Sequence, residues 1–143
     1  MKLPPRMEKI LLMACGENLK ETEIARKLGI SKQAVSKALR EARGRLVQIF
    51  LTIADILNAD IVRVNVEKGY AILRLRQTGQ KAYIIYIPGK GPKTLFEKPL
   101  NLDEANTRFY EEIVEASIKW GIIQAEDLEL PRVLEKLLNN MET

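Results

Sequence analysis

Three glutamates in the C-terminal part of the chain, Glu111, Glu112 and Glu115, form a cluster of side chains that could act as acids, bases or metal ligands. Helical spacing relative to the apolar residue Ile113 places them on the outer face of a helix. The chain has no histidine, and therefore lacks the commonest general base and zinc ligand. We expect a solvated acidic face here, with no catalytic residue, no metal site and no cofactor.

A second group of reactive side chains, Asp60, Tyr70, Lys81 and Tyr83, lies in the middle of the chain. These would be the catalytic groups if the protein were an enzyme or a nucleic-acid processing factor. The tyrosines could also line a small-molecule pocket or stack on bases, but aromatic residues in strands more often pack against neighbouring strands. The absence of histidine disfavours the enzyme, so we expect a protein without catalytic activity.

Charge is distributed unevenly along the 143 residues. Residues 1–45 carry 11 basic and 5 acidic side chains, a net charge of +6. Residues 46–100 carry 8 and 4, a net charge of +4, and residues 101–143 carry 4 and 10, a net charge of −6. This polarity predicts that an anionic partner binds the N-terminal part.

Composition favours one ordinary globular chain, with 46% hydrophobic and 29% charged residues. We find no apolar run long enough to span a membrane and no signal peptide at the N-terminus. The single cysteine, Cys15, suits a reducing compartment and is expected in the core, with a redox-sensing thiol as the alternative. We therefore expect a cytoplasmic protein without membrane association.

Apolar residues at helical spacing predict helices over residues 6–16 and 19–28 and a third helix from Ser31 to about Leu57. Gly29 can adopt the positive φ of a sharp helix exit, and Ser31 is a suitable N-cap for the third helix. Three antiparallel strands are expected within residues 61–87, followed by a loop over residues 88–99. Two further helices are expected over residues 102–120 and 131–140.

The stretch from Glu21 to Leu39 resembles the helix-turn-helix motif of sigma factors, response regulators and other small bacterial and archaeal regulators. Ala25 is small where the two helices would cross, Gly29 makes the turn, and Val35 anchors the second helix. The resemblance covers about residues 20–40 and implies a DNA-binding transcriptional regulator. The C-terminal region resembles no effector domain.

The predicted fold is therefore α+β, with an N-terminal three-helix helix-turn-helix head. A long connecting helix leads into a three-stranded antiparallel meander with C-terminal helices. We expect a DNA-binding head over residues 1–45 and a dimerisation and effector tail over residues 46–143. Within the tail, the elements expected are the long helix 46–57, strands 61–87 and helices 102–120 and 131–140.

The resemblance implies that the helix over residues 31–43 enters the major groove of double-stranded DNA. Gln33 could bridge an adenine edge, and Lys32 or Lys37 could reach guanine acceptors. Basic residues farther from the groove are expected at phosphates. The implied base-facing residues are Ser31, Lys32, Gln33, Ser36 and Lys37, and the expected phosphate contacts are Arg26, Lys27, Arg40, Arg43 and Arg45.

The third helix also carries a coiled-coil-like seam of Leu46, Ile49, Ile53 and Ile56. This seam predicts a homodimer, because such readers usually bind paired half-sites. The alternative is that the seam packs under the strands of its own chain. Gly44 is expected to mark a kink or a break in the helix.

Residues Pro88–Thr94 hold glycines and lysines but lack the spacing of a phosphate-binding loop, so we expect a surface loop in which Lys90 and Lys93 touch the DNA backbone. The expected function is sequence-specific DNA binding as a regulator, with any small-molecule effector unknown. The alternative is a protein-interaction adaptor that uses the head and the acidic C-terminal helices.

Overall fold

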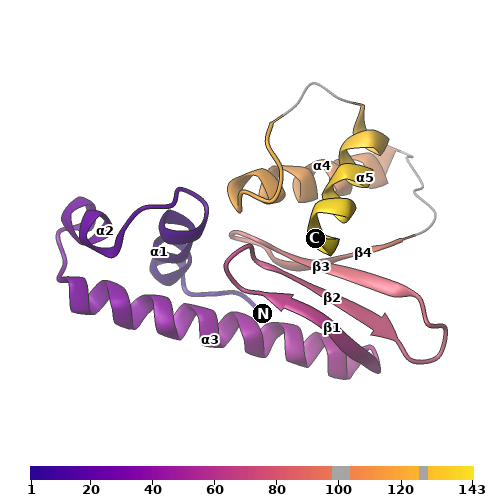
Figure 1. Cartoon of the computed structure of the whole chain (residues 1–143), viewed down its shortest axis with the longest axis horizontal. Helices are drawn as coiled ribbons and strands as arrows, with labels where there is room; N and C mark the ends of the chain where they lie inside the picture. Colours follow the sequence, from indigo (N-terminus) through magenta and orange to yellow (C-terminus); the bar gives the residue numbers. More distant parts are fainter. Residues whose placement is uncertain (98–103, 126–128) are drawn as a thin grey trace.

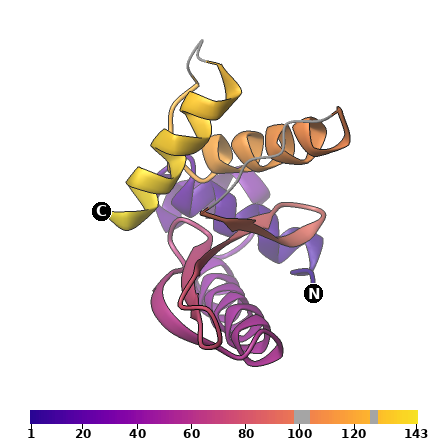
Figure 2. The same cartoon turned by 90° about the vertical axis from the view of Figure 1, so that its right-hand side faces the viewer.

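The computed structural model describes residues 1–97, 104–125 and 129–143. Its elements are helices α1 (Pro5–Cys15), α2 (Glu21–Leu28) and α3 (Lys32–Ile56), strands β1 (Ala59–Asn65), β2 (Tyr70–Leu75), β3 (Lys81–Ile87) and β4 (Gly91–Phe96), and helices α4 (Glu104–Lys119) and α5 (Leu130–Glu142). The sheet lies between α3 on one face and α4 and α5 on the other, whereas α1 and α2 lie over the N-terminal half of α3 (Figures 1 and 2).

Local sequence signals define the first three helices. A proline occupies the first turn of α1, where its missing N–H would have had no partner within the helix. Gly29 ends α2 in the left-handed conformation, with φ of 66°, and the hydroxyl of Ser31 accepts a hydrogen bond from the backbone N–H of Ala34 at 3.0 Å. The α+β class and the three-helix head are confirmed.

Helix α3 is continuous over 25 residues, which makes it about 37 Å long. Its N-terminal half belongs to the head and its C-terminal half packs under the sheet (Figure 1). The predicted kink or break at Gly44 is wrong, because the helix passes through this residue without interruption. The division of the chain at residues 45 and 46 stays a prediction, and it falls inside this helix.

Replacing Gly44 by alanine is expected to raise the free energy of unfolding by about 0.5–1 kcal/mol. Gly44 has helical backbone, and no atom lies within 4 Å of the position that a Cβ would take. Urea denaturation followed by circular dichroism measures the change. Gly29→Ala is the matched control: its φ is positive, so we expect it to lower stability by about 1–2 kcal/mol. A destabilised Gly44→Ala protein would contradict the account of α3.

The sheet is a four-stranded antiparallel meander in the order β1-β2-β3-β4. The prediction of three strands and of a loop over residues 88–99 is wrong, since β4 pairs with β3 from Gly91 to Phe96. The glycine and proline residues of this segment are uncommon in strands, so the sequence did not predict one here. Pro92 is tolerated because β4 is an edge strand of this sheet. Leu95 of β4 is buried. Residues 98 and 99 of the expected loop and residues 102 and 103 of the expected helix lie outside the described residues.

Alternation along the strands divides the core into two layers. Ala71, Leu73 and Ile84 face α3 and join the core formed by α1, α2 and α3. Tyr70, Ile72, Tyr83, Ile85 and Ile87 face α4 and α5 in a second core. Both faces of the sheet are therefore covered. On the face that packs against α3, the head and the sheet share one apolar core.

Candidate nucleic-acid interface

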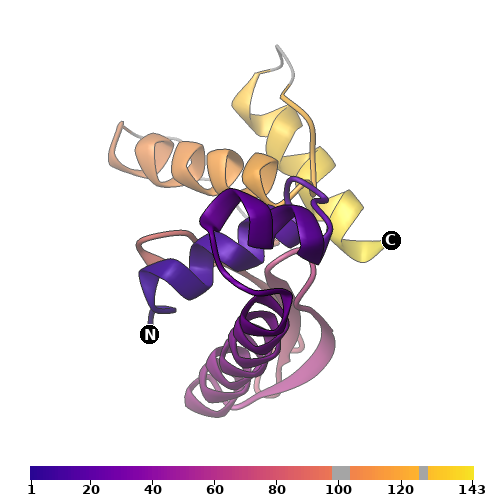
Figure 3. The same ribbon diagram turned by 90° about the vertical axis from the view of Figure 1, so that its left-hand side faces the viewer.

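The outer face of the N-terminal half of α3 presents Gln33, Lys37 and Arg40. Intervals of four and three residues place these side chains one above another on a helix, and all three are exposed. On the other side of the helix, Val35 and Leu39 are buried against the head. Figure 3, which looks along α3 from its N-terminal end, shows α2 above this part of the helix. The exposed residues form a polar and basic surface on a rigid helix.

Two of the implied base-facing residues have hydroxyls that already make structural bonds. Ser31 caps α3, as described above. Ser36, which is half-buried, donates a hydrogen bond to the carboxylate of Glu21 on α2 at 2.7 Å. The Ser31 bond fixes the start of α3, and the Ser36 bond joins α3 to α2. The other three implied residues, Lys32, Gln33 and Lys37, are exposed and make no comparable side-chain bond within the described part of the chain.

Arg43 is turned toward the tail. Its Nε lies 2.6 Å from a carboxylate oxygen of Glu67, which is in the turn between β1 and β2, and the other carboxylate oxygen accepts from the thiol of Cys15 at 3.1 Å. Partial burial opposes ionisation of Glu67, but these hydrogen bonds lower its pKa. Arg43 therefore links α3 to the sheet, contrary to the phosphate contact predicted for it. Sequence reasoning missed Glu67, because 24 residues separate the pair.

Cys15 is buried beside this pair. Burial, followed by the hydrogen bond to Glu67, raises the pKa of its thiol to about 12. A protonated, buried thiol matches the expected core position and disfavours the redox-sensing alternative.

The remaining residues expected at phosphates, Arg26, Lys27, Arg40 and Arg45, are all exposed. Arg26 and Lys27 lie in the last turn of α2, beside the start of α3. Arg45 lies five residues after Arg40 and therefore points about 140° away around the helix. Arg40 is thus part of the exposed surface of Gln33, Lys37 and Arg40, and Arg26 and Lys27 lie on the neighbouring helix. Arg45 lies on a different side of α3.

The predicted dimer seam faces mostly inward. Leu46 is 0% exposed within its own chain, so it has no surface to offer a second copy, and Ile49 and Ile53 are half-buried against the same core. Ile56 is 66% exposed. Leu46 lies in the core that α1, α2, α3 and the sheet share, so the structure does not support the use of this residue in a dimer seam. Helical spacing alone does not distinguish the chain's own sheet from a second helix.

The side chains considered for catalysis form hydrogen bonds and ion pairs with other parts of the fold. Tyr70 donates to the backbone oxygen of Met141 at 3.0 Å, and Asp60 pairs with Arg76 at 2.9 Å. Lys81 and Tyr83 both bond to Glu142 at 2.9 Å. Within residues 1–97, 104–125 and 129–143, no group of acidic or cysteine side chains could hold a metal ion.

The acidic surface of α4 is partly neutralised. Glu112 lies 2.6 Å from Lys90, and this hydrogen bond lowers the pKa of Glu112. Glu111 and Glu115 are exposed. The pairing turns Lys90 toward the acidic helix, so the DNA-backbone contact predicted for it is not supported. Among the described residues, no helix has the length and apolar character needed to cross a membrane.

Comparison with known proteins assigns the head. Residues 1–46 match the family model for region 4 of sigma-70. The match covers α1, α2 and the N-terminal half of α3, the elements that carry the exposed polar surface. No curated protein and no solved structure matches the chain. Together with its geometry, the match supports a helix-turn-helix DNA-binding domain over residues 1–46 that is similar to region 4 of sigma-70.

Proposed function

We propose that this protein is a transcriptional regulator that binds double-stranded DNA in a sequence-specific manner and has no catalytic activity. The observation that carries the proposal is the polar, basic surface of Gln33, Lys37 and Arg40 on the helix-turn-helix domain matched over residues 1–46. The N-terminal half of α3 enters the major groove, which is wide enough to admit a helix.

Base recognition then depends on the three exposed side chains Lys32, Gln33 and Lys37. The amide of Gln33 suits a bidentate contact with adenine, and the lysines suit the acceptors of guanine. Ser31 and Ser36 act as positioning residues, because their hydroxyls fix the start of α3 and join α3 to α2. Arg26, Lys27 and Arg40 contact phosphates, whereas Arg45 lies on a different side of α3 and Arg43 stabilises the junction with the sheet.

The protein acts as a dimer on paired half-sites about 34–36 Å apart. Support comes from exposed apolar side chains far from the reading surface: Leu51 and Ile56 on α3, and Ile61 and Val62 on the edge strand β1. Sedimentation at tens of micromolar tests the dimer. A monomer at that concentration would contradict it.

Selection of binding sites from random duplexes, followed by titration across salt, tests the DNA-binding proposal. If Arg26, Lys27 and Arg40 each neutralise one phosphate, the logarithm of affinity falls with the logarithm of salt at a slope of about −2.7 per protomer. An enriched sequence bound in preference to scrambled duplex supports a regulator. Equal binding to all duplexes would instead indicate an architectural protein.

An adaptor remains the second candidate because of a groove of about 450 Å³ between α4 and α5. The apolar side chains of Val114, Ile118 and Val133 line it, and the exposed carboxylates of Glu111 and Glu115 lie at its rim. Such a groove suits a basic amphipathic segment of another protein. Charge reversal at Lys32 and Lys37 distinguishes the two: it removes DNA binding but leaves binding of a partner to the groove unchanged.

A further inference from the structure

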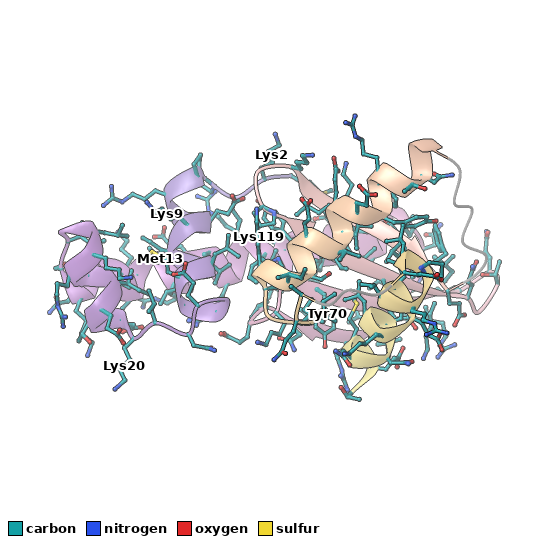
Figure 4. The ribbon with its side chains drawn as sticks, turned by 90° about the horizontal axis from the view of Figure 1, so that it is seen from above. Lys2, Lys9, Met13, Lys20, Tyr70 and Lys119 are labelled. Carbon is teal, nitrogen blue, oxygen red and sulfur yellow. The ribbon has the colours of Figure 1, made fainter. Side chains whose placement is uncertain are left out.

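A cleft of about 560 Å³ lies where the head meets the tail. One wall is α1 and the other is the last turn of α4. Figure 4 shows Lys9 and Met13 on α1 and Lys119 at the end of α4 that faces α1. The volume falls within the range of about 300–1,000 Å³ that is typical of small-molecule sites.

Direct contacts on both sides hold the walls of this cleft together. At Gly16, the end of α1 passes so close to α4 that a Cβ would overlap the carbonyl oxygen of Lys119. A carboxylate oxygen of Glu8 also ties α1 to the sheet: it accepts hydrogen bonds from the hydroxyl of Tyr86 in β3 at 2.6 Å and from the backbone N–H of Gly89 at 3.1 Å. The cleft is therefore framed by ordered contacts between two parts of the fold.

The lining combines both signs of charge with an apolar surface. Lys9 and Lys119 supply an ammonium group from each wall, and Glu17 supplies an exposed carboxylate beyond the Glu8 carboxylate just described. Between them lie the side chains of Leu12, Met13 and Ile118. A simple anion would meet repulsion from two carboxylates, and a simple cation would meet repulsion from two ammonium groups.

A zwitterion with an apolar side chain satisfies all three features. We propose that this cleft binds a free α-amino acid with an apolar side chain. Its carboxylate lies toward Lys9 and Lys119, its ammonium group toward Glu17, and its side chain on Leu12, Met13 and Ile118.

Binding in the cleft also changes DNA affinity, a step that rests on the proposed function. Ile10 and Leu11 of α1 are buried in the same core as Leu39 of the reading helix. A ligand that alters the contact between α1 and α4 therefore changes the setting of the head relative to the tail. By linkage, DNA and amino acid then alter each other's affinity by the same factor.

Three probes with the same branched apolar end test the site: L-leucine, 4-methylpentanoate, which lacks the ammonium group, and 3-methylbutylamine, which lacks the carboxylate. Each is titrated into the DNA-free protein at up to millimolar concentration, and the methyl NMR signals of Met13 and Ile118 are followed. We expect saturable shifts with L-leucine and up to about fivefold weaker binding of each analogue, since a partly exposed ion pair contributes about 0.2–1 kcal/mol. No shift with L-leucine, or equal affinity for all three probes, would overturn the site.

Variants separate this cleft from the rest of the surface. Ile118 is 37% exposed and also lines the groove between α4 and α5, whereas Met13 lines this cleft and not that groove. Ile118→Trp fills the cleft from its rim and is expected to abolish the leucine-induced shift of Met13, which is the signal that distinguishes the two sites. Lys119→Gln is expected to weaken leucine binding up to about fivefold. Lys20→Gln, which removes the same charge from an exposed position outside the cleft, leaves binding unchanged. Undiminished leucine binding by Ile118→Trp contradicts the location.

DNA affinity measured with and without L-leucine tests the regulatory part. A change in the natural protein that is absent from Ile118→Trp supports it, and an unchanged affinity with the cleft occupied overturns it. Absence of DNA binding under all conditions overturns the proposed function instead. The NMR titration of the DNA-free protein decides the amino-acid site in either case.

Discussion

Replacing both Lys37 and Arg40 by alanine is expected to weaken specific DNA binding by about 2–4 kcal/mol, roughly 30- to 1,000-fold. Both side chains are exposed on the outer face of the reading helix, and neither is an ion-pair partner within the described residues. In the proposed function, Lys37 reads a base and Arg40 neutralises a phosphate. The double variant should therefore lose sequence preference and also reduce the magnitude of the salt slope by about one.

The matched control is a double variant of two exposed arginines in the tail, Arg74→Ala with Arg132→Ala. It removes the same total charge from positions outside the head. Fluorescence anisotropy with selected and scrambled duplexes measures both proteins, and circular dichroism checks that each is folded. If the two double variants lose affinity equally, attraction by net charge explains binding and the proposed reading surface is wrong.

Two arginines on neighbouring turns of α3 make different contacts, and the sequence does not distinguish them. Arg40 and Arg43 are three residues apart and both were expected at phosphates. Arg40 is exposed, whereas Arg43 is held by Glu67 from the turn between β1 and β2. A charged residue on a predicted helix has the same appearance in either role, and the choice between solvent and an ion pair is made by tertiary packing.

The head was predictable because its signals are local. Gly29 and Ser31 determine where one helix ends and the next begins, and apolar residues at helical spacing indicate which side of α3 is buried and which is exposed. Strand β4 was not predictable in the same way. It is six residues long and contains a glycine and a proline, and pairing with β3 rather than intrinsic preference makes it a strand.

The seam on α3 shows a further limit of periodicity. Leu46, Ile49 and Ile53 do form an apolar stripe, but the stripe packs into the chain's own core, which α1, α2, α3 and the sheet share. A hydrophobic stripe requires a cover, and the pattern does not specify which chain supplies it. The cleft between α1 and α4 was equally invisible, since Lys9 and Lys119 are brought together only by the fold.

Trp120→Ala is expected to lower the free energy of unfolding by about 3–5 kcal/mol, the range for removing a large aromatic side chain from a core. Trp120 directly follows α4 and is 0% exposed. Although α4 covers one face of the sheet, the side chain of Trp120 belongs to the core that α1, α2 and α3 form with the opposite face. Its indole N–H donates to the backbone oxygen of Tyr86 at 2.8 Å, and the rings of Trp120 and Tyr86 meet edge-on at 6.5 Å.

Gly69 completes the environment of this side chain. Its φ is +67°, and a Cβ at this position would overlap the indole ring of Trp120. The turn between β1 and β2 therefore closes directly over the tryptophan. Removing the indole leaves a cavity bounded by backbone that is fixed by the sheet and leaves the Tyr86 oxygen without its donor, so little relaxation can offset the loss.

Urea denaturation followed by far-UV circular dichroism measures this effect, because Trp120 is the only tryptophan and its removal also removes the fluorescence signal. Ile118→Ala, a truncation two residues earlier at a side chain that is 37% exposed, is the matched control, with an expected loss below about 1 kcal/mol. Since Tyr86 also bonds to Glu8 and to the N–H of Leu3, we expect head and tail of the Trp120→Ala protein to unfold in one transition at lower urea. A separate transition for the head would show that α3 and these bonds do not couple the two parts, and would contradict the route by which a ligand in the cleft acts on DNA affinity.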